Sequence, residues 1–110
     1  MFSATFMVRV AGYDEQFHKL NNRIIEIAEA NPGYLGRESW LDGDRNVVVL
    51  YWKTLEDLQA FGTHPEHLHA KAQYKSWYAG YKVIIAEVLR EYGDGNYPEP
   101  FMGDAGEVHG

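Results

Sequence analysis

The sequence of 110 residues contains no cysteine. Disulfide bonds, thiolate nucleophiles and zinc–thiolate sites are therefore excluded. Positive charge is also scarce, because 10 Lys and Arg stand against 16 Asp and Glu and give a net charge of −6. The basic residues form no cluster, and phosphate binding requires one, so we expect no nucleic-acid partner. No apolar run approaches the roughly 20 residues that span a bilayer, so we expect no membrane partner.

A glycine-rich phosphate loop is missing as well. The segment Gly33-Tyr34-Leu35-Gly36 leads into an expected strand and not into the start of a helix, where phosphates bind. We therefore expect no nucleotide, no flavin and no other bound cofactor. The first ten residues lack the basic, apolar and small-residue regions of a signal peptide, which makes the cytoplasm the expected location.

The length and the composition, with 45% hydrophobic and 24% charged side chains, indicate one globular domain. Apolar residues alternate at the N-terminus, which indicates a strand, and recur every three or four positions after Asp14, which indicates a helix with Asp14 as its N-cap. Thr54 and Pro65 are typical of two further helix starts. The expected order is a strand at 1–10, a helix between Asp14 and Asn31, strands at 34–41 and 47–52, helices from Thr54 and from Pro65 to about Tyr78, and a strand at 81–92.

This order predicts the ferredoxin-like α+β fold, β-α-β-β-α-β, with a four-stranded antiparallel sheet. We expect the domain to span residues 1–93 and an irregular tail to span 94–110. In the strands at 47–52 and 81–92 both faces are apolar, whereas two helices cover only one face of a sheet. We therefore predict a homodimer that packs sheet against sheet.

Three motifs carry a resemblance to a known family. They are Asn31-Pro32-Gly33-Tyr34-Leu35-Gly36, Val48-Val49-Leu50-Tyr51-Trp52 followed by Thr54-Leu55-Glu56-Asp57-Leu58, and His64-Pro65-Glu66-His67-Leu68. In these segments the chain resembles the antibiotic biosynthesis monooxygenases. The resemblance implies a dimeric α/β barrel with a pocket between helices and sheet, and its members include cofactor-free oxygenases of phenols and quinols as well as haem-degrading enzymes.

The haem-degrading branch matches this chain at Trp52-Lys53-Thr54 but departs from it elsewhere. That branch carries a tryptophan where Phe61 stands, its haem-ligating histidine falls at Lys71, and the first strand lacks its asparagine. Haem degradation is therefore disfavoured.

His64 and His67 are the candidate catalytic residues. An imidazole titrates near pH 6.5, which suits a general base toward a phenolic or enolic substrate. The competing interpretation is structural: His64 bonds backbone at the helix start, while His67 and His69 face water. A metal site formed by His64, Glu66 and His67 is a weaker alternative, because it lacks a further ligand.

Candidate substrate-binding residues surround this segment. Several aromatic side chains carry polar groups that need partners when buried. We therefore expect some of these side chains to line either a pocket or the dimer interface. The alternative is that they are ordinary core residues. Arg9 and Arg37 stand on strands and either hold a substrate anion or form ion pairs at the dimer interface with Glu38, Glu87 or another acid. The full candidate set is Arg9, Arg37, Trp52, Phe61, Tyr74, Trp77, Tyr78 and Tyr81.

The leading hypothesis is a cofactor-independent monooxygenase. A histidine removes a proton from a small aromatic, phenolic or enolic molecule, and the resulting carbanion reacts directly with dioxygen. The alternative is a non-catalytic homodimer that binds a small apolar ligand, and haem binding is the third choice.

Overall fold

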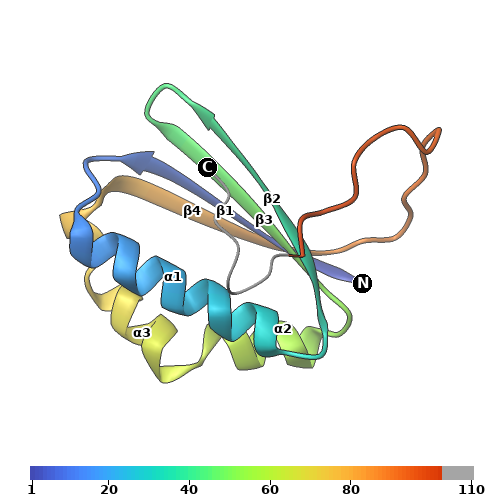
Figure 1. Cartoon of the computed structure of the whole chain (residues 1–110), viewed down its shortest axis with the longest axis horizontal. Helices are drawn as coiled ribbons and strands as arrows, with labels where there is room; N and C mark the ends of the chain where they lie inside the picture. Colours follow the sequence, from blue (N-terminus) through green and yellow to red (C-terminus); the bar gives the residue numbers. More distant parts are fainter. Residues whose placement is uncertain (103–110) are drawn as a thin grey trace.

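The computed structural model describes residues 1–102. Four antiparallel strands form one sheet in the order β2-β3-β1-β4, and the helices lie together on one of its faces (Figure 1). This arrangement confirms the predicted ferredoxin-like α+β fold. The elements are β1 (Phe2–Val10), α1 (Glu15–Ala30), β2 (Tyr34–Asp42), β3 (Arg45–Trp52), α2 (Leu55–Gly62), α3 (Pro65–Ala72), the 3-10 turn η1 (Tyr74–Ser76) and β4 (Tyr78–Glu87).

The helices begin at the caps that the sequence predicts. The Asp14 carboxylate accepts the backbone N–H of Phe17 at 2.8 Å at the start of α1. The Thr54 hydroxyl accepts the N–H of Asp57 at 3.1 Å at the start of α2. Both bonds satisfy backbone donors that a helix leaves unpaired at its N-terminus.

Three predicted boundaries are wrong. The helix expected to reach Tyr78 ends at Ala72 and is followed by η1, and β4 begins at Tyr78 and ends at Glu87, not at 81 and 92. The backbone carbonyl of Trp77 accepts the N–H groups of Ala11 and Gly12 at 2.8 and 3.2 Å, which ties this stretch to the end of β1.

The core lies between the sheet and the helices. Ala28 of α1, Tyr34 of β2, Trp52 of β3 and Leu58 of α2 form one buried cluster, with Trp52 0% exposed. Phe2 of β1 lies opposite Trp52 in the sheet, so β1 and β3 share this face. We call it the helix face, and the opposite side of the sheet the open face.

After β4 the chain forms an arch, residues 88–101, that stands away from the sheet and returns to it (Figure 1). Its first end is held by the N–H of Val88, which donates to the carbonyl of Met1 at 2.9 Å. Its second end is held by two backbone hydrogen bonds between Phe101 and Arg37, both 2.9 Å long. No helix in the described part of the chain is long and apolar enough to cross a membrane. The predicted division of the chain at residue 93 stays a prediction.

Candidate active site

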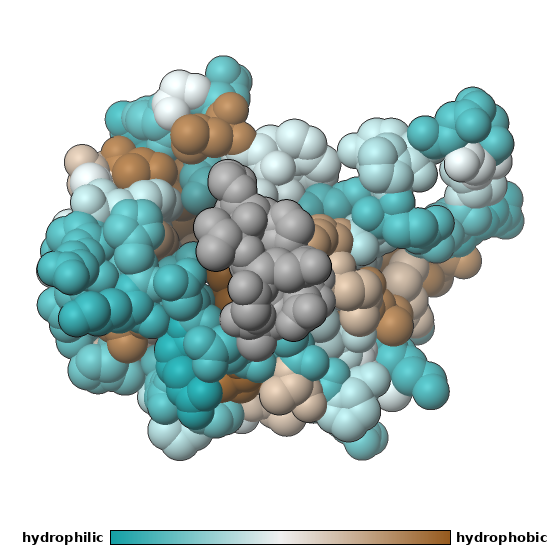
Figure 2. All heavy atoms as spheres, viewed as in Figure 1, coloured by the Kyte–Doolittle hydropathy of each residue, from teal (hydrophilic) through white to brown (hydrophobic). Residues whose placement is uncertain are grey.

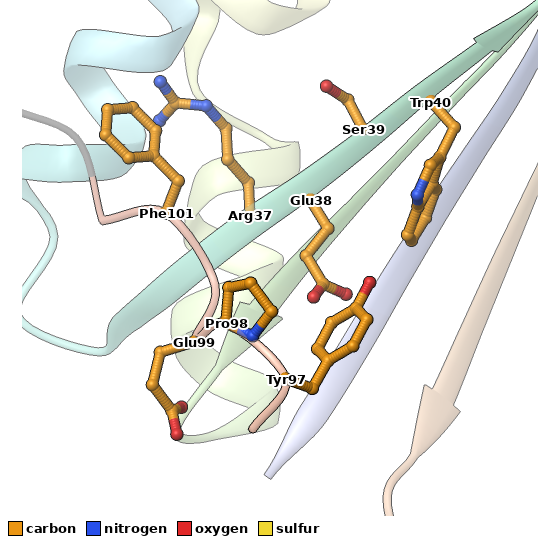
Figure 3. A pocket seen from close by; sticks show the side chains of 8 residues that line it. All are labelled: Arg37, Glu38, Ser39, Trp40, Tyr97, Pro98, Glu99 and Phe101. Carbon is orange, nitrogen blue, oxygen red and sulfur yellow. The ribbon is translucent and has the colours of Figure 1, made fainter. Parts of the chain in front are cut away.

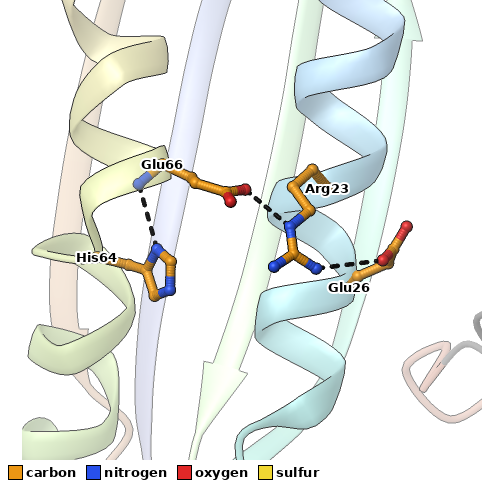
Figure 4. Close-up of polar contacts among 4 residues, drawn as sticks. All are labelled: Arg23, Glu26, His64 and Glu66. Atoms are coloured by element: carbon orange, nitrogen blue, oxygen red, sulfur yellow. Dashed lines mark hydrogen bonds and ion pairs between the residues drawn. The ribbon is translucent and has the colours of Figure 1, made fainter.

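His64 caps α3. Its Nδ1 atom accepts the backbone N–H of Glu66 at 3.2 Å, and the Glu66 carboxylate binds the Nε atom of Arg23 on α1 at 2.8 Å (Figure 4). Because Nδ1 accepts, the neutral ring carries its proton on Nε2. His64 therefore has the structural role that the sequence left open for it, and its neutral ring presents a donor to its surroundings.

His67 is half-buried, so the expectation that it faces water is wrong. Its Nδ1 atom lies 3.1 Å from the carbonyl oxygen of Phe61. A carbonyl only accepts, so Nδ1 carries the proton and Nε2 keeps a lone pair, with no hydrogen bond to any residue from 1 to 102. Burial lowers the pKa of His67, the bond to Phe61 opposes this shift, and the charges of Lys71 and His64 add to it. At neutral pH His67 is an uncharged base.

A row of rings connects His67 to the core. The ring of His67 lies 4.6 Å from that of Phe61, and Phe61 lies 5.0 Å from Trp52. The ring of Tyr34 also packs on Trp52, at 5.4 Å. The Nε1–H group of Trp52 is buried and has no hydrogen-bond partner in the described structure. An unpaired buried donor costs about 1 to 3 kcal/mol, which makes this N–H a notable feature of the site.

The remaining predicted aromatics form a second cluster around Phe6 of β1. The rings of Tyr78 and Tyr81 lie 5.6 and 6.1 Å from Phe6, and Tyr74 lies 4.9 Å from Tyr81. Burial raises the pKa of Tyr78, and the nearby Tyr13 adds to this shift, so the Tyr78 hydroxyl is neutral at physiological pH.

Trp77 differs from these tyrosines because it is a core residue. It is 3% exposed, its ring packs on Phe17 at 5.4 Å, and its Nε1–H donates to the Asp14 carboxylate at 3.1 Å.

The two arginines have carboxylate partners within the chain. Arg9 is exposed and binds Asp44 at 3.3 Å. Arg37 is largely buried and donates from Nη1 to Glu29 and to the Tyr34 hydroxyl, both at 3.0 Å. Both arginines therefore pair within the chain with acids other than Glu38 and Glu87. The ion pair at the dimer interface stays a prediction.

Two hollows open on other parts of the surface. One of about 560 Å³ lies where β1, β2, β3 and β4 meet near their ends, and Arg9 and Tyr81 are the predicted residues that line it. The other, of about 260 Å³, lies between β2 and the returning part of the arch (Figure 3). It is lined by Arg37, Glu38, Ser39, Trp40, Tyr97, Pro98, Glu99 and Phe101.

Among residues 1–102 no group of three or more His, Asp and Glu side chains is arranged to hold a metal ion. His64, Glu66 and His67 are instead engaged with a helix N-terminus, Arg23 and a backbone carbonyl. His67 offers a base and the N–H of Trp52 offers a hydrogen-bond donor, and these two groups suit a proton-transfer reaction.

Sequence reasoning missed Tyr34 and Phe6 as parts of the two aromatic clusters. Tyr34 belongs to the motif Asn31-Pro32-Gly33-Tyr34-Leu35-Gly36, which carries the family resemblance but does not indicate where the Tyr34 side chain packs. Phe6 was assigned to the apolar face of a strand, and nothing local distinguishes it from its neighbours Ala4 and Val8.

Together, the helices on one face of an antiparallel sheet and the histidine–aromatic site between them define a ferredoxin-like α+β protein with a candidate site for proton transfer. Residues 3–86 match the family described as monooxygenase af470-like. The chain is also 33% identical over 93 residues to the uncharacterized protein YqjZ of Bacillus subtilis, covering 83% of this chain and 78% of YqjZ. The chain belongs to the monooxygenase af470-like family.

Solved structures share the fold at low sequence identity. SnoaB, a cofactor-independent oxygenase from Streptomyces nogalater, superposes with a TM-score of 0.68 at 10% identity over 84% of this chain and 97% of SnoaB. A putative antibiotic biosynthesis monooxygenase from Nitrosomonas europaea gives 0.65 at 21% identity, over 82% and 100% of the two chains. Rv0793 from Mycobacterium tuberculosis gives 0.67 at 16%, over 84% and 100%. These likenesses confirm the fold expected from the resemblance.

Proposed function

We propose that the protein is a cofactor-independent monooxygenase of a small aromatic molecule. The observation that carries the proposal is a base and a buried donor on two rings that both pack against Phe61. His67 offers a lone pair on Nε2, Trp52 offers a buried N–H without a partner among residues 1–102, and Phe61 packs against both. A base removes a proton, and a donor in a water-poor site stabilises the oxyanion that forms. The family to which the chain belongs supports this function.

The helix face suggests where such a substrate lies. Phe2, Ala4 and Phe6 follow one another on this face of β1, with Phe2 beside Trp52 and Phe6 inside the second aromatic cluster. Ala4 is the smallest side chain of this row. In this proposal the ring of the substrate lies near Ala4, between Trp52 and the tyrosines Tyr74, Tyr78 and Tyr81.

The chemistry needs no external reductant. A methylene group between two aromatic rings that a ketone also joins loses a proton to Nε2 of His67. The ketone oxygen takes up the negative charge, and the methylene carbon of this anion adds dioxygen. The peroxide takes up the proton, and loss of water leaves a carbonyl, so that CH2 and O2 become C=O and H2O. The carbon gives up four electrons and dioxygen accepts four. His67 carries the proton in both directions, while Trp52 donates to the oxygen that becomes negatively charged.

The other candidate residues have secondary roles in this proposal. His64 presents Nε2–H in its neutral form and is the less suitable base. Arg9 and Arg37 already neutralise Asp44 and Glu29, which makes them weaker holders of a substrate anion than the sequence suggests. Trp77 supports the tyrosine cluster from the core.

Oxygen uptake with anthrone tests the function, because this molecule has a methylene group between two rings. The wild type should consume one O2 per anthrone and form anthraquinone without hydrogen peroxide. His67→Asn keeps an N–H for the Phe61 carbonyl and removes the base, so it should lower kcat about 100-fold or more. An unchanged rate in this variant contradicts the assignment. Binding of anthrone without oxygen uptake above buffer supports the ligand-binding alternative instead.

We further propose that the active form is a homodimer built through the sheets. Apolar side chains on both faces of β4 are exposed, Ile84 on the open face at 39% and Val83 and Ile85 on the helix face at 48% and 54%. Trp40 of β2 is 49% exposed on the open face, and Figure 2 shows apolar surface beside the foot of the arch. Surfaces of this kind mark protein interfaces.

Light scattering at micromolar concentration tests the dimer. Ile84→Lys should give monomers, whereas Leu68→Lys, at a similarly exposed leucine on α3 (48%), should leave the dimer intact. A monomeric wild type, or dissociation of both variants, contradicts the proposed interface.

A further inference from the structure

Arg37 joins the end of the arch to the core. Its backbone N–H and C=O pair with Phe101 at 2.9 Å in both directions, and its guanidinium lies 4.9 Å from the centre of the Phe101 ring. The same guanidinium donates at 3.0 Å to Glu29 on α1. Figure 3 shows the Phe101 ring against the Arg37 side chain, with Pro98 farther back along the arch. Three elements thus meet at one side chain.

Arg37 is also connected to the candidate site, through Tyr34. Its Nη1 atom donates to the Tyr34 hydroxyl at 3.0 Å. Tyr34 is 3% exposed, and its ring packs on Trp52 at 5.4 Å. Phe101, Arg37, Tyr34 and Trp52 therefore form an unbroken series of contacts from the arch to the buried N–H group.

Gly36 allows the arch to come this close. Its φ angle is +116°, a conformation that disfavours other residues, and an added Cβ would lie 2.8 Å from Cβ of Pro100 and 3.1 Å from its carbonyl oxygen. The backbone of β2 is thus shaped at this position for contact with the arch.

We propose that Arg37 and Phe101 are positioning residues that hold Trp52 in place for the substrate. This inference rests on the proposed function for its purpose, but the coupling itself is independent of any substrate. The arch end holds the guanidinium from one side while Glu29 holds it from the other, which fixes the hydroxyl of Tyr34. With Tyr34 fixed, the indole of Trp52 keeps a single orientation between Tyr34 and Phe61. A displacement of about 1 Å in the position of such a group lowers the catalytic rate by up to about 100-fold.

The indole N–H signals in a ¹H–¹⁵N spectrum test the coupling, and the three tryptophans can be assigned by Trp→Phe substitution. Phe101→Leu removes the ring, Phe101→Tyr keeps it, and Gly36→Ala pushes against Pro100 and strains the backbone next to Arg37. Tyr92→Ala is the matched control, since Tyr92 lies in the arch and is 90% exposed. The Trp77 signal, whose N–H is bonded to Asp14, reports on the fold as a whole.

Phe101→Leu and Gly36→Ala should both move the Trp52 signal and speed its exchange with water by about tenfold. Phe101→Tyr and Tyr92→Ala should leave it in place, and the Trp77 signal should stay fixed throughout. An unmoved Trp52 signal in the first two variants, or the same movement in Tyr92→Ala, overturns the proposal. With anthrone, these two variants should lower kcat about tenfold. If the wild type shows no turnover, the proposed function fails, while the spectra still decide the positioning role.

Discussion

The same substitution at two buried tryptophans should have different effects on stability. Trp52 and Trp77 are 0% and 3% exposed. The Trp52 N–H has no partner among the described residues, whereas the Trp77 N–H donates to the Asp14 carboxylate at 3.1 Å. Replacing each by phenylalanine removes a similar volume from the core, so the cavity cost is common to both variants and cancels in their difference.

The remaining difference comes from the hydrogen bond. Trp77→Phe loses a bond to a charged acceptor, which contributes about 1.5 to 3 kcal/mol to the free energy of unfolding. Trp52→Phe removes an unpaired buried donor and so relieves a cost of about 1 to 3 kcal/mol. We therefore expect Trp77→Phe to be less stable than Trp52→Phe by about 2 to 5 kcal/mol, allowing for partial relaxation of the side chains.

Urea unfolding followed by far-ultraviolet circular dichroism measures this difference, provided that the two variants show the same dependence of free energy on urea. A Trp52→Phe variant as unstable as Trp77→Phe refutes the reasoning, because it shows that the indole N–H of Trp52 is satisfied in solution. The proposed donor of the active site then loses its main support.

Three further predictions concern His67, the helix cap Asp14 and the ion pair of Glu66. The pKa of His67 lies below its ordinary value of 6.5, so as the pH falls the unfolded chain binds a proton before the folded chain does. The free energy of unfolding should therefore fall as the pH drops from 7 through 6.5 and level off below the pKa of the folded state. His67→Asn should flatten this part of the curve of stability against pH. Asp14→Ala should cost about 2 to 4 kcal/mol in urea unfolding, since it removes a cap and leaves the Trp77 N–H unpaired, whereas Asp14→Asn should cost less than about 1.5 kcal/mol. Glu66→Gln should change stability by less than about 1 kcal/mol even at low salt, because its pair with Arg23 is exposed to water.

The element order followed from the sequence because it depends on local signals. Alternation, helical periodicity and the caps Asp14, Thr54 and Pro65 all act within a few residues. The end of β4 depends on a distant partner: this strand pairs with β1 alone, β1 begins at Phe2, and Phe2 lies opposite Glu87. The apolar residues Val88 and Leu89 continue the pattern of a strand but have no further β1 residue beside them.

The helix expected to reach Tyr78 ended early for a similar reason. Tyr74, Trp77 and Tyr81 have helical spacing, but Trp77 is bound to Asp14 through its side chain and to Ala11 through its backbone. These bonds join residues that lie far apart in the sequence, 63 positions for Trp77 and Asp14, and periodicity carries no information about them. The role of His64 is easier to predict, since a residue before a proline at a helix start is a natural cap.

One inserted residue explains why the surroundings of Arg37 escaped prediction. Strict alternation from Tyr34 places Arg37 on the opposite face of β2, where it would meet neither Tyr34 nor Glu29. The register instead pairs Tyr34 with Trp52 and Gly36 with Tyr51, so the strand bulges and Leu35 has no counterpart. From Gly36 onward every side chain changes face, which brings Arg37 to the helix face and turns Trp40 to the open face. The positive φ of Gly36 thus decides both which arginine supports the candidate site and which tryptophan is left for the proposed dimer.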